Sequence, residues 1–268
     1  MTMGSAGSAA RAATVALLGG TGKTGRAVQA ALAQAGVEAR ALGRAALADL
    51  PAALAGTDAV YLIAPNLHPD EPGYVTAVLD AMRLSEVHRV VYHSVASPYV
   101  PAMPHHVGKA VSEDLVRRSG HAWTILQPCA YVQNLVPALL DATLSVPYSL
   151  QRPFGLVDLD DVAAAAAVVL TEPGHAGATY ELGGPALVTL AEVADQAAEV
   201  LGRPVAATRT DPEEWAGAGL EERERAWLRA MFRYYDAYGL PTGGLPLQAL
   251  LGRPPLPVAG VLARELSA

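Results

Sequence analysis

The stretch VALLGGTGKTGRAV at residues 15–28 is the part of this sequence that most clearly suggests chemistry. Gly19, Gly22 and Gly25 stand three residues apart, after an apolar run and before a segment with apolar residues at helical spacing. Between a strand and a helix, such glycines make a tight turn, let the backbone approach a pyrophosphate and allow close packing of the helix on the strand. The free N–H groups of the helix attract phosphate. The stretch therefore predicts a nucleotide-binding turn, and its spacing differs from that of a P-loop.

Lysine is rare in this chain: of 19 basic residues, only Lys23 and Lys109 are lysines. The abundance of Ala, Gly, Pro and Arg indicates a coding bias that replaces lysine by arginine wherever either serves. The two lysines are then candidates for positions that need a compact ammonium, which the planar guanidinium does not replace.

Arg44 follows the second expected strand, in the segment ALGR. An NAD site usually has Asp or Glu at this position to bind the ribose hydroxyls, whereas an arginine there suits the 2′-phosphate of NADP(H). The alternative is a surface arginine at a strand end.

The hydrophobic pattern alternates between strand and helix along most of the chain. We expect strands over 13–19, 37–42, 58–64, 89–94, 123–126, 180–182 and 205–208, and helices over 25–34, 47–54, 74–84, 106–119, 131–140, 162–170 and 190–201. This order predicts an α/β fold, a Rossmann-type doubly wound parallel sheet with a small C-terminal substrate lobe. We expect a flexible leader over 1–12, a Rossmann-type NADP-binding region over 13–151, and the remaining sheet elements with a mainly helical substrate-binding lobe over 152–268.

Composition excludes several classes of protein. The net charge is −7 without a basic cluster, which argues against nucleic acid as a partner. No apolar run approaches the roughly 20 residues that span a bilayer, so we expect no membrane partner. The single cysteine, Cys129, fits a reducing cytoplasm. Asp158, Asp160 and Asp161 open an expected helix, where carboxylates cap and complement the dipole, so no metal is predicted.

The chain resembles the NmrA-like branch of the atypical short-chain dehydrogenase/reductase superfamily in segments that cover nearly all of 13–268. They are LLGGTGKTGRAV, ALGR, TDAVYLIAP, HRVVYHSVASP, MPHHVGKAVSEDLVRRSG, WTILQPCAYVQNL, VDLDDVAAAAAVVL, EEWAGAGL, MFRYYDAYGL and LLGRPP. The resemblance implies a domain that binds NADP(H). Members of the family reduce quinones, imines or conjugated alkenes, or sense nucleotides without catalysis.

The resemblance also implies roles for individual residues. The glycine loop would bind the pyrophosphate, Arg44 the 2′-phosphate, and Lys109 the nicotinamide ribose. The cofactor-binding set is Gly19, Thr21, Gly22, Lys23, Thr24, Gly25, Arg44, Ala64, Pro65, Lys109, Pro128 and Cys129, with Ala64 and Pro65 under the cofactor and Pro128 and Cys129 beside the nicotinamide.

The chain departs from the superfamily at the proton donor, a tyrosine four residues before the active-site lysine. Here that position is His105, followed by His106. Together with Lys109 these histidines form the predicted catalytic set, because a histidine with a pKa near 6.5 can donate a proton. Alternatively, they shape the loop. The predicted substrate contacts are Ser94, Tyr131 and Asn134. For Tyr131 and Asn134, core or capping roles are the alternative.

A second departure is the short connection between Arg44 and Asp58, whose 13 residues suffice for one short helix. One peripheral strand of the usual fold is therefore predicted to be deleted after strand 2. The strand at 37–42 would become a sheet edge, which must be covered or blunted, and the adenine would lose one wall. Among the remaining segments, His68, Asp70 and Glu71 are expected in a solvated loop.

The sequence favours a cytoplasmic NADPH-dependent oxidoreductase that transfers hydride to a small, fairly apolar organic acceptor (an iminium, quinone or enone), in specialised metabolism. One alternative is a redox-neutral cyclase or isomerase that uses the old cofactor cleft as its substrate pocket. The other is a non-catalytic NADP(H)-sensing regulator. The expected partner is a small-molecule substrate, and the protein would be a monomer or homodimer.

Overall fold

A six-stranded, all-parallel sheet forms the centre of the computed structural model, which describes residues 12–215 and 217–267. The strand order is β2-β1-β3-β4-β5-β7. The strands are β1 (Thr14–Leu18), β2 (Glu38–Leu42), β3 (Ala59–Leu62), β4 (Arg89–His93), β5 (Ala122–Pro128) and β7 (Ala178–Leu182). The predicted Rossmann-type fold is confirmed. The predicted leader lies outside the described residues except for Ala12, which is buried.

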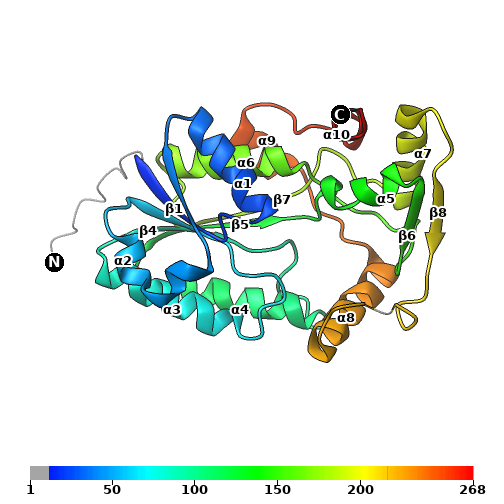
Figure 1. Ribbon diagram of the computed structural model, residues 1–268. Helices are drawn as coiled ribbons and strands as arrows, with labels where there is room; N and C mark the ends of the chain where they lie inside the picture. The colour runs from blue at the N-terminus through cyan, green and yellow to red at the C-terminus, as the bar shows by residue number, and fades with distance from the viewer. Residues whose placement is uncertain (1–11, 216, 268) are drawn as a thin grey trace.

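Helices cover both faces of the sheet, as Figure 1 shows. α1 (Lys23–Gln34) and α6 (Leu159–Thr171) pack together on one face. α2 (Leu50–Leu54), α3 (Glu71–Leu84) and α4 (Pro104–Arg118) cover the other. Side chains of successive strand residues point to opposite faces, so Tyr61 joins the core under α1 and α6, while Tyr92 joins the core under α3 and α4.

The short connection after β2 has the effect expected from the sequence. Its residues form a 3-10 turn (Arg44–Ala48) and α2, and β2 is left at the edge of the sheet, paired with β1 alone. The edge is blunted by charge: the Arg40 guanidinium donates hydrogen bonds to the carbonyl oxygens of Ala53 (3.4 Å) and Ala55 (3.0 Å), at the end of α2.

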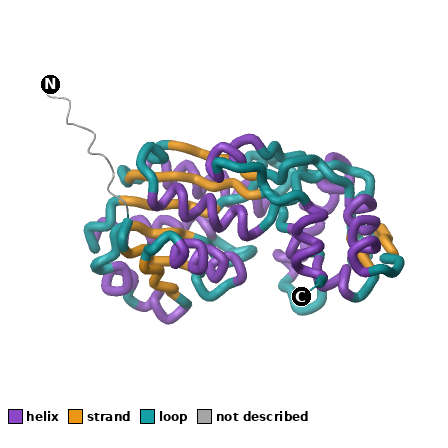
Figure 2. Tube along the Cα trace, turned by 90° about the horizontal axis from the view of Figure 1, so that it is seen from above, coloured by secondary structure: helices purple, strands orange, loops and turns teal. Residues whose placement is uncertain are grey.

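The second half of the chain differs from the expectation in two places. The predicted helix over 131–140 is a 3-10 turn (Val132–Asn134) followed by α5 (Val136–Leu140). An unpredicted strand, β6 (Thr143–Val146), pairs with β8 (Ala206–Arg209) in a separate parallel sheet, so β8 does not extend the main sheet. Figure 2 shows the main sheet and this small sheet near opposite ends of an elongated molecule.

The remaining helices are α7 (Leu190–Leu201), α8 (Glu222–Tyr238), α9 (Leu245–Leu251) and α10 (Val258–Leu266). The α9 helix packs on α6 and β7, whereas α10 packs on α7. Within the described ranges, no helix has the length and apolar character needed to cross a membrane.

Candidate active site

The predicted site residues come together because parallel strands end at the same edge of the sheet. The glycine loop follows β1, and Ala64 and Pro65 follow β3. Ser94 follows β4, and Cys129 follows β5. In open α/β sheets the crevice outside these carboxyl ends is where ligands bind. We call this region the crevice.

The glycine loop has the conformation that a pyrophosphate site requires. Gly19 has a φ of 77°, a value that side chains disfavour, and a Cβ at Gly25 would lie 2.4 Å from the Gly19 carbonyl oxygen. Gly22 is the N-cap of α1, and within the described part of the chain no side chain caps this helix and no acidic residue stands in its first turn. The open N–H groups and the absence of a competing carboxylate fit a bound pyrophosphate.

Lys23 connects this loop to two of the predicted substrate residues. Its Nζ donates a hydrogen bond to Asn134 Oδ1 at 2.5 Å and lies 5.9 Å from the centroid of the Tyr131 ring. Partial burial lowers the pKa of Lys23, and the Glu265 carboxylate opposes that shift. The structure thus brings Lys23, Tyr131 and Asn134 to the same side of the crevice.

Lys109 is buried in an ion pair that the sequence did not predict. Its Nζ donates to Glu71 Oε1 at 2.7 Å, and the Tyr92 hydroxyl donates to the same oxygen at 2.5 Å. Lys109 is 9% exposed and Glu71 only 3%. The expectation of a solvated Glu71 was wrong, because Asp70 caps α3 and the first turn of that helix then carries the Glu71 side chain inward.

Burial keeps the two predicted proton donors uncharged near neutral pH. It lowers the pKa of both His105 and His106 to about 4, and the Lys109 ammonium adds to the effect. The His106 ring contacts the Ser97 carbonyl oxygen through Nδ1 (3.3 Å) and the Tyr235 hydroxyl through Nε2 (3.5 Å). The imidazolium form that the prediction requires is therefore scarce.

Other predicted residues are held in separate contacts. The Ser94 hydroxyl donates to Glu113 Oε1 at 2.5 Å, a buried carboxylate that also accepts from Gln127 at 2.7 Å. Burial raises the pKa of Cys129 to about 11, so this residue stays a thiol. Arg44 is exposed at the start of the 3-10 turn after β2, and its contact with the 2′-phosphate stays a prediction.

Ala64 is buried behind β3 and Pro65 is exposed beside it, while Pro128 is buried at the end of β5. In the glycine loop, Thr21 is exposed and Thr24 is partly buried. The contacts of these residues with the cofactor stay predictions.

A buried chain of hydrogen bonds that the sequence did not predict lies next to the crevice. The Tyr61 hydroxyl lies 2.7 Å from His93 Nδ1, and the Tyr131 hydroxyl lies 3.0 Å from His93 Nε2. Burial lowers the pKa of His93 to about 3, so the ring is neutral. The signal available in the sequence was the YHS segment, which puts a histidine at the carboxyl end of an expected strand.

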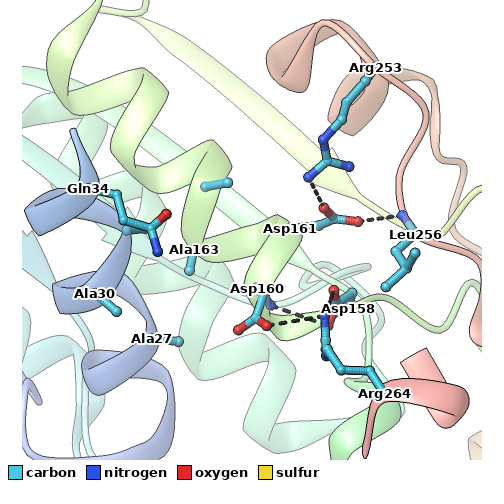
Figure 3. Close-up of a pocket in the computed structure, with 12 residues that line it drawn as sticks. Ala27, Ala30, Gln34, Asp158, Asp160, Asp161, Ala163, Arg253, Leu256 and Arg264 are labelled. Carbon is cyan, nitrogen blue, oxygen red and sulfur yellow. Dashed lines mark hydrogen bonds and ion pairs between the residues drawn. The ribbon is translucent and has the colours of Figure 1, made fainter. Parts of the chain in front are cut away.

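The three aspartates at the start of α6 serve in ion pairs, shown in Figure 3. Asp158 caps the helix and pairs with Arg264 at 2.7 Å, and Asp161 pairs with Arg253 at 2.6 Å. Asp160 lies 3.2 Å from Arg264. The three aspartates line a cavity of about 550 Å³ between α1, α6 and the C-terminal segment. None of the residues that line this cavity belongs to the predicted cofactor or substrate sets.

Comparison with known proteins agrees with this geometry. Residues 45–173 match the family model described as NAD(P)H-binding. The chain is 32% identical over 227 residues to the (4-alkanoyl-5-oxo-2,5-dihydrofuran-3-yl)methyl phosphate reductase of Streptomyces griseus, covering 78% of this chain and 76% of the relative. It is 34% identical over 163 residues to the NAD(P)H azoreductase of Xenophilus azovorans, covering 58% of this chain and 56% of that relative, so the match spans little more than half of the azoreductase.

A solved NADPH-dependent quinone oxidoreductase of Escherichia coli, crystallised with NADPH, has the same fold. It superposes with a TM-score of 0.79 at 24% identity, over 93% of this chain and 99% of the other.

The fold, the open glycine loop and these matches define an NAD(P)H-binding protein of the Rossmann type, in the class of NAD(P)H-dependent oxidoreductases. The chain belongs to the same family as the Streptomyces griseus reductase. The solved NmrA regulator, a complex with NAD, shares the fold with a TM-score of 0.76 at 16% identity, in line with the predicted resemblance. The predictions of family, fold, enzyme class and cofactor are confirmed at this level.

Proposed function

We propose that this protein uses NADPH to reduce a small, fairly apolar, conjugated acceptor such as a quinone, an iminium or an enone. The observation that carries the proposal is that the open N-terminus of α1 and the two lysines, Lys23 and Lys109, lie around one crevice. When bound, NADPH supplies a hydride from C4 of its nicotinamide. A role in specialised metabolism remains a prediction from the sequence.

The acceptor class is supported by an aromatic side chain that α8 places beside His105, one of the predicted catalytic residues. The Trp227 ring of α8 stacks on His105 at 6.2 Å between centroids, and His105 in turn lies near the Lys109 ammonium. The Arg223 guanidinium lies 4.9 Å from the Trp227 ring centroid and donates to the Leu67 carbonyl oxygen, which ties α8 to the loop after β3. Flat conjugated molecules stack well on such surfaces.

The relatives' names support the same class of acceptor. An azo bond, a dihydrofuranone and a quinone are all conjugated and electron-poor, so they accept hydride without a strong acid. The structure offers no tyrosine four residues before Lys109, and the histidines there are neutral, which makes reduction of a simple carbonyl less favourable.

Titration of the purified protein with NADPH and NADH, followed by fluorescence, tests the proposal directly. We expect NADPH to bind and to be consumed with at least one member of a panel of quinones, iminiums and enones. Failure to bind NADPH at millimolar concentration would refute the proposal. Binding without turnover on the panel would favour a nucleotide sensor instead.

A further inference from the structure

A single line of hydrogen bonds runs from the core of the sheet to the crevice through Tyr61, His93 and Tyr131. The distances are 2.7 Å from the Tyr61 hydroxyl to His93 Nδ1 and 3.0 Å from His93 Nε2 to the Tyr131 hydroxyl. The three residues come from β3, from the end of β4 and from the loop after β5. Tyr61 is fully buried, His93 is 7% exposed, and Tyr131 is partly exposed.

The direction of these bonds follows from burial. Among the described residues, the Tyr61 hydroxyl has one hydrogen-bond partner, His93 Nδ1. A buried O–H group that fails to donate costs about 1–3 kcal/mol, so Tyr61 donates and Nδ1 accepts. Because a neutral imidazole carries one proton, that proton is on Nε2. His93 therefore donates to the Tyr131 oxygen, and the Tyr131 hydrogen is free to point elsewhere.

Tyr131 is placed where a free donor is useful. Its ring lies 5.9 Å from Lys23 Nζ, and its hydroxyl is within hydrogen-bonding reach of the Thr24 side chain, both in the glycine loop. The Lys109 ammonium is close enough to lower the pKa of His93. The line of hydrogen bonds thus ends in the crevice, between Lys23 and Lys109. Burial raises the pKa of the Tyr131 hydroxyl, so Tyr131 keeps its proton at neutral pH.

We propose that Tyr131 is the proton donor of this enzyme, and that His93 and Tyr61 are positioning residues that fix its donor direction. The proposal rests on the reductase function proposed above. A neutral acceptor such as a quinone or enone carries one negative charge once it has received a hydride; the Tyr131 O–H bond then breaks, and the proton passes to the acceptor's heteroatom or carbon. The product leaves as the neutral dihydro compound. The phenolate of Tyr131 is stabilised by the His93 Nε2–H hydrogen bond until solvent returns a proton.

This arrangement replaces the missing tyrosine of the wider superfamily from a different part of the chain. The superfamily's donor precedes the active-site lysine on the same helix, whereas Tyr131 follows β5 and reaches the crevice from the opposite face of the sheet to Glu71 and Tyr92. Tyr131 would therefore approach the hydride acceptor from another direction than a tyrosine on the helix of the active-site lysine.

The tautomer of His93 is the first test, and it requires neither cofactor nor turnover. Nitrogen-15 NMR of the cofactor-free protein, with the His93 signals assigned from a His93→Gln variant, should show the proton on Nε2. In Tyr61→Phe this preference should weaken, because Nδ1 has lost its donor. A wild-type ring protonated on Nδ1 would overturn the proposal, since Tyr131 would then donate to His93 rather than to the crevice.

The second test uses 4-nitrophenolate, an oxyanion that resembles a reduced quinone. We expect its Kd for the cofactor-free protein to rise about tenfold in Tyr131→Phe, and quinone turnover to fall about 100-fold, the lower range for a lost general acid. The Kd for NADPH should stay within about threefold. Tyr180→Phe is the matched control, since its hydroxyl also bonds a histidine, His175 Nδ1 at 2.8 Å, but outside the crevice; it should behave as wild type.

The two proposals fail separately. If the wild type reduces no acceptor but the nitrophenolate contrast between wild type and Tyr131→Phe is present, the reductase function is wrong and the donor position stands. If Tyr131→Phe binds nitrophenolate and turns over quinone like the wild type, Tyr131 is not the donor, and the reductase function is unaffected.

Discussion

Replacement of Glu71 by glutamine tests the buried ion pair that holds Lys109. Glu71 accepts hydrogen bonds from Lys109 Nζ (2.7 Å) and from the Tyr92 hydroxyl (2.5 Å), with only 3% of its own surface exposed. Glutamine fits the same space but removes the negative charge, so the ammonium of a 9% exposed lysine is left without a counter-charge. Removal of one partner from a buried pair typically costs about 3–5 kcal/mol.

We expect the lower end of that range, about 3 kcal/mol, because the glutamine oxygen still accepts one of the two hydrogen bonds. In a chain of this size such a loss lowers Tm by roughly 6–12 °C. Urea unfolding at pH 7, analysed by linear extrapolation, measures the free energy of unfolding directly. The double variant Glu71→Gln/Lys109→Met removes both charges, and it should recover most of the lost stability.

Asp80→Asn is the matched control on the same helix. Asp80 pairs with Arg83 at 2.6 Å, but the two side chains are 59% and 52% exposed, so this change should cost less than about 1 kcal/mol. A cost below about 1 kcal/mol for Glu71→Gln as well would contradict our account of Lys109. Our account would also be contradicted if the double variant lost as much stability as the two single variants together, because the two charges would then not be coupled.

Three further predictions concern the cofactor loop and the buried histidine. Gly25→Ala should abolish NADPH binding and destabilise the protein, because the alanine Cβ would lie 2.4 Å from the Gly19 carbonyl oxygen. As the control, Gly108→Ala in the open part of α4 should raise the free energy of unfolding in urea by about 0.5–1 kcal/mol. Arg44→Ala should weaken the binding of NADPH relative to that of NADH by about 1.5–3 kcal/mol, roughly 10- to 150-fold in Kd. The control Arg118→Ala should leave this preference unchanged. An unchanged preference in Arg44→Ala would mean that Arg44 does not bind the 2′-phosphate. Burial lowers the pKa of His93 from 6.5 to about 3, so as the pH falls the unfolded chain binds a proton at His93 before the folded chain does. The stability that neutral His93 contributes is complete above pH 6.5 and is lost toward pH 3 at about 1.4 kcal/mol per pH unit. His93→Gln should therefore reduce the pH dependence of the free energy of unfolding, measured in urea between pH 6 and 5, and an unchanged dependence would refute the lowered pKa of His93.

The amino-acid sequence was sufficient where the determinants are local. The apolar run, the glycine spacing and the amphipathic helix after it lie within 14 consecutive residues, and together they predicted the glycine-rich turn between β1 and α1. The 13 residues between Arg44 and Asp58 limited the connection to one short helix, which predicted that β2 would be a sheet edge. Chain length and periodicity set such features almost independently of the rest of the molecule.

The tertiary structure decided the features that depend on contacts between distant residues. Glu71 was expected in solvent, but the docking of α3 beside α4 turned it toward Lys109, 38 positions away. His93 received no role from its local pattern, and it became the middle of a line only because the parallel register brings β3, β4 and the loop after β5 side by side. The pairing of β6 with β8 joins segments about 60 residues apart in the same way. Short-range periodicity carries no information on which of many possible partners a side chain meets, whereas packing of the whole chain selects one.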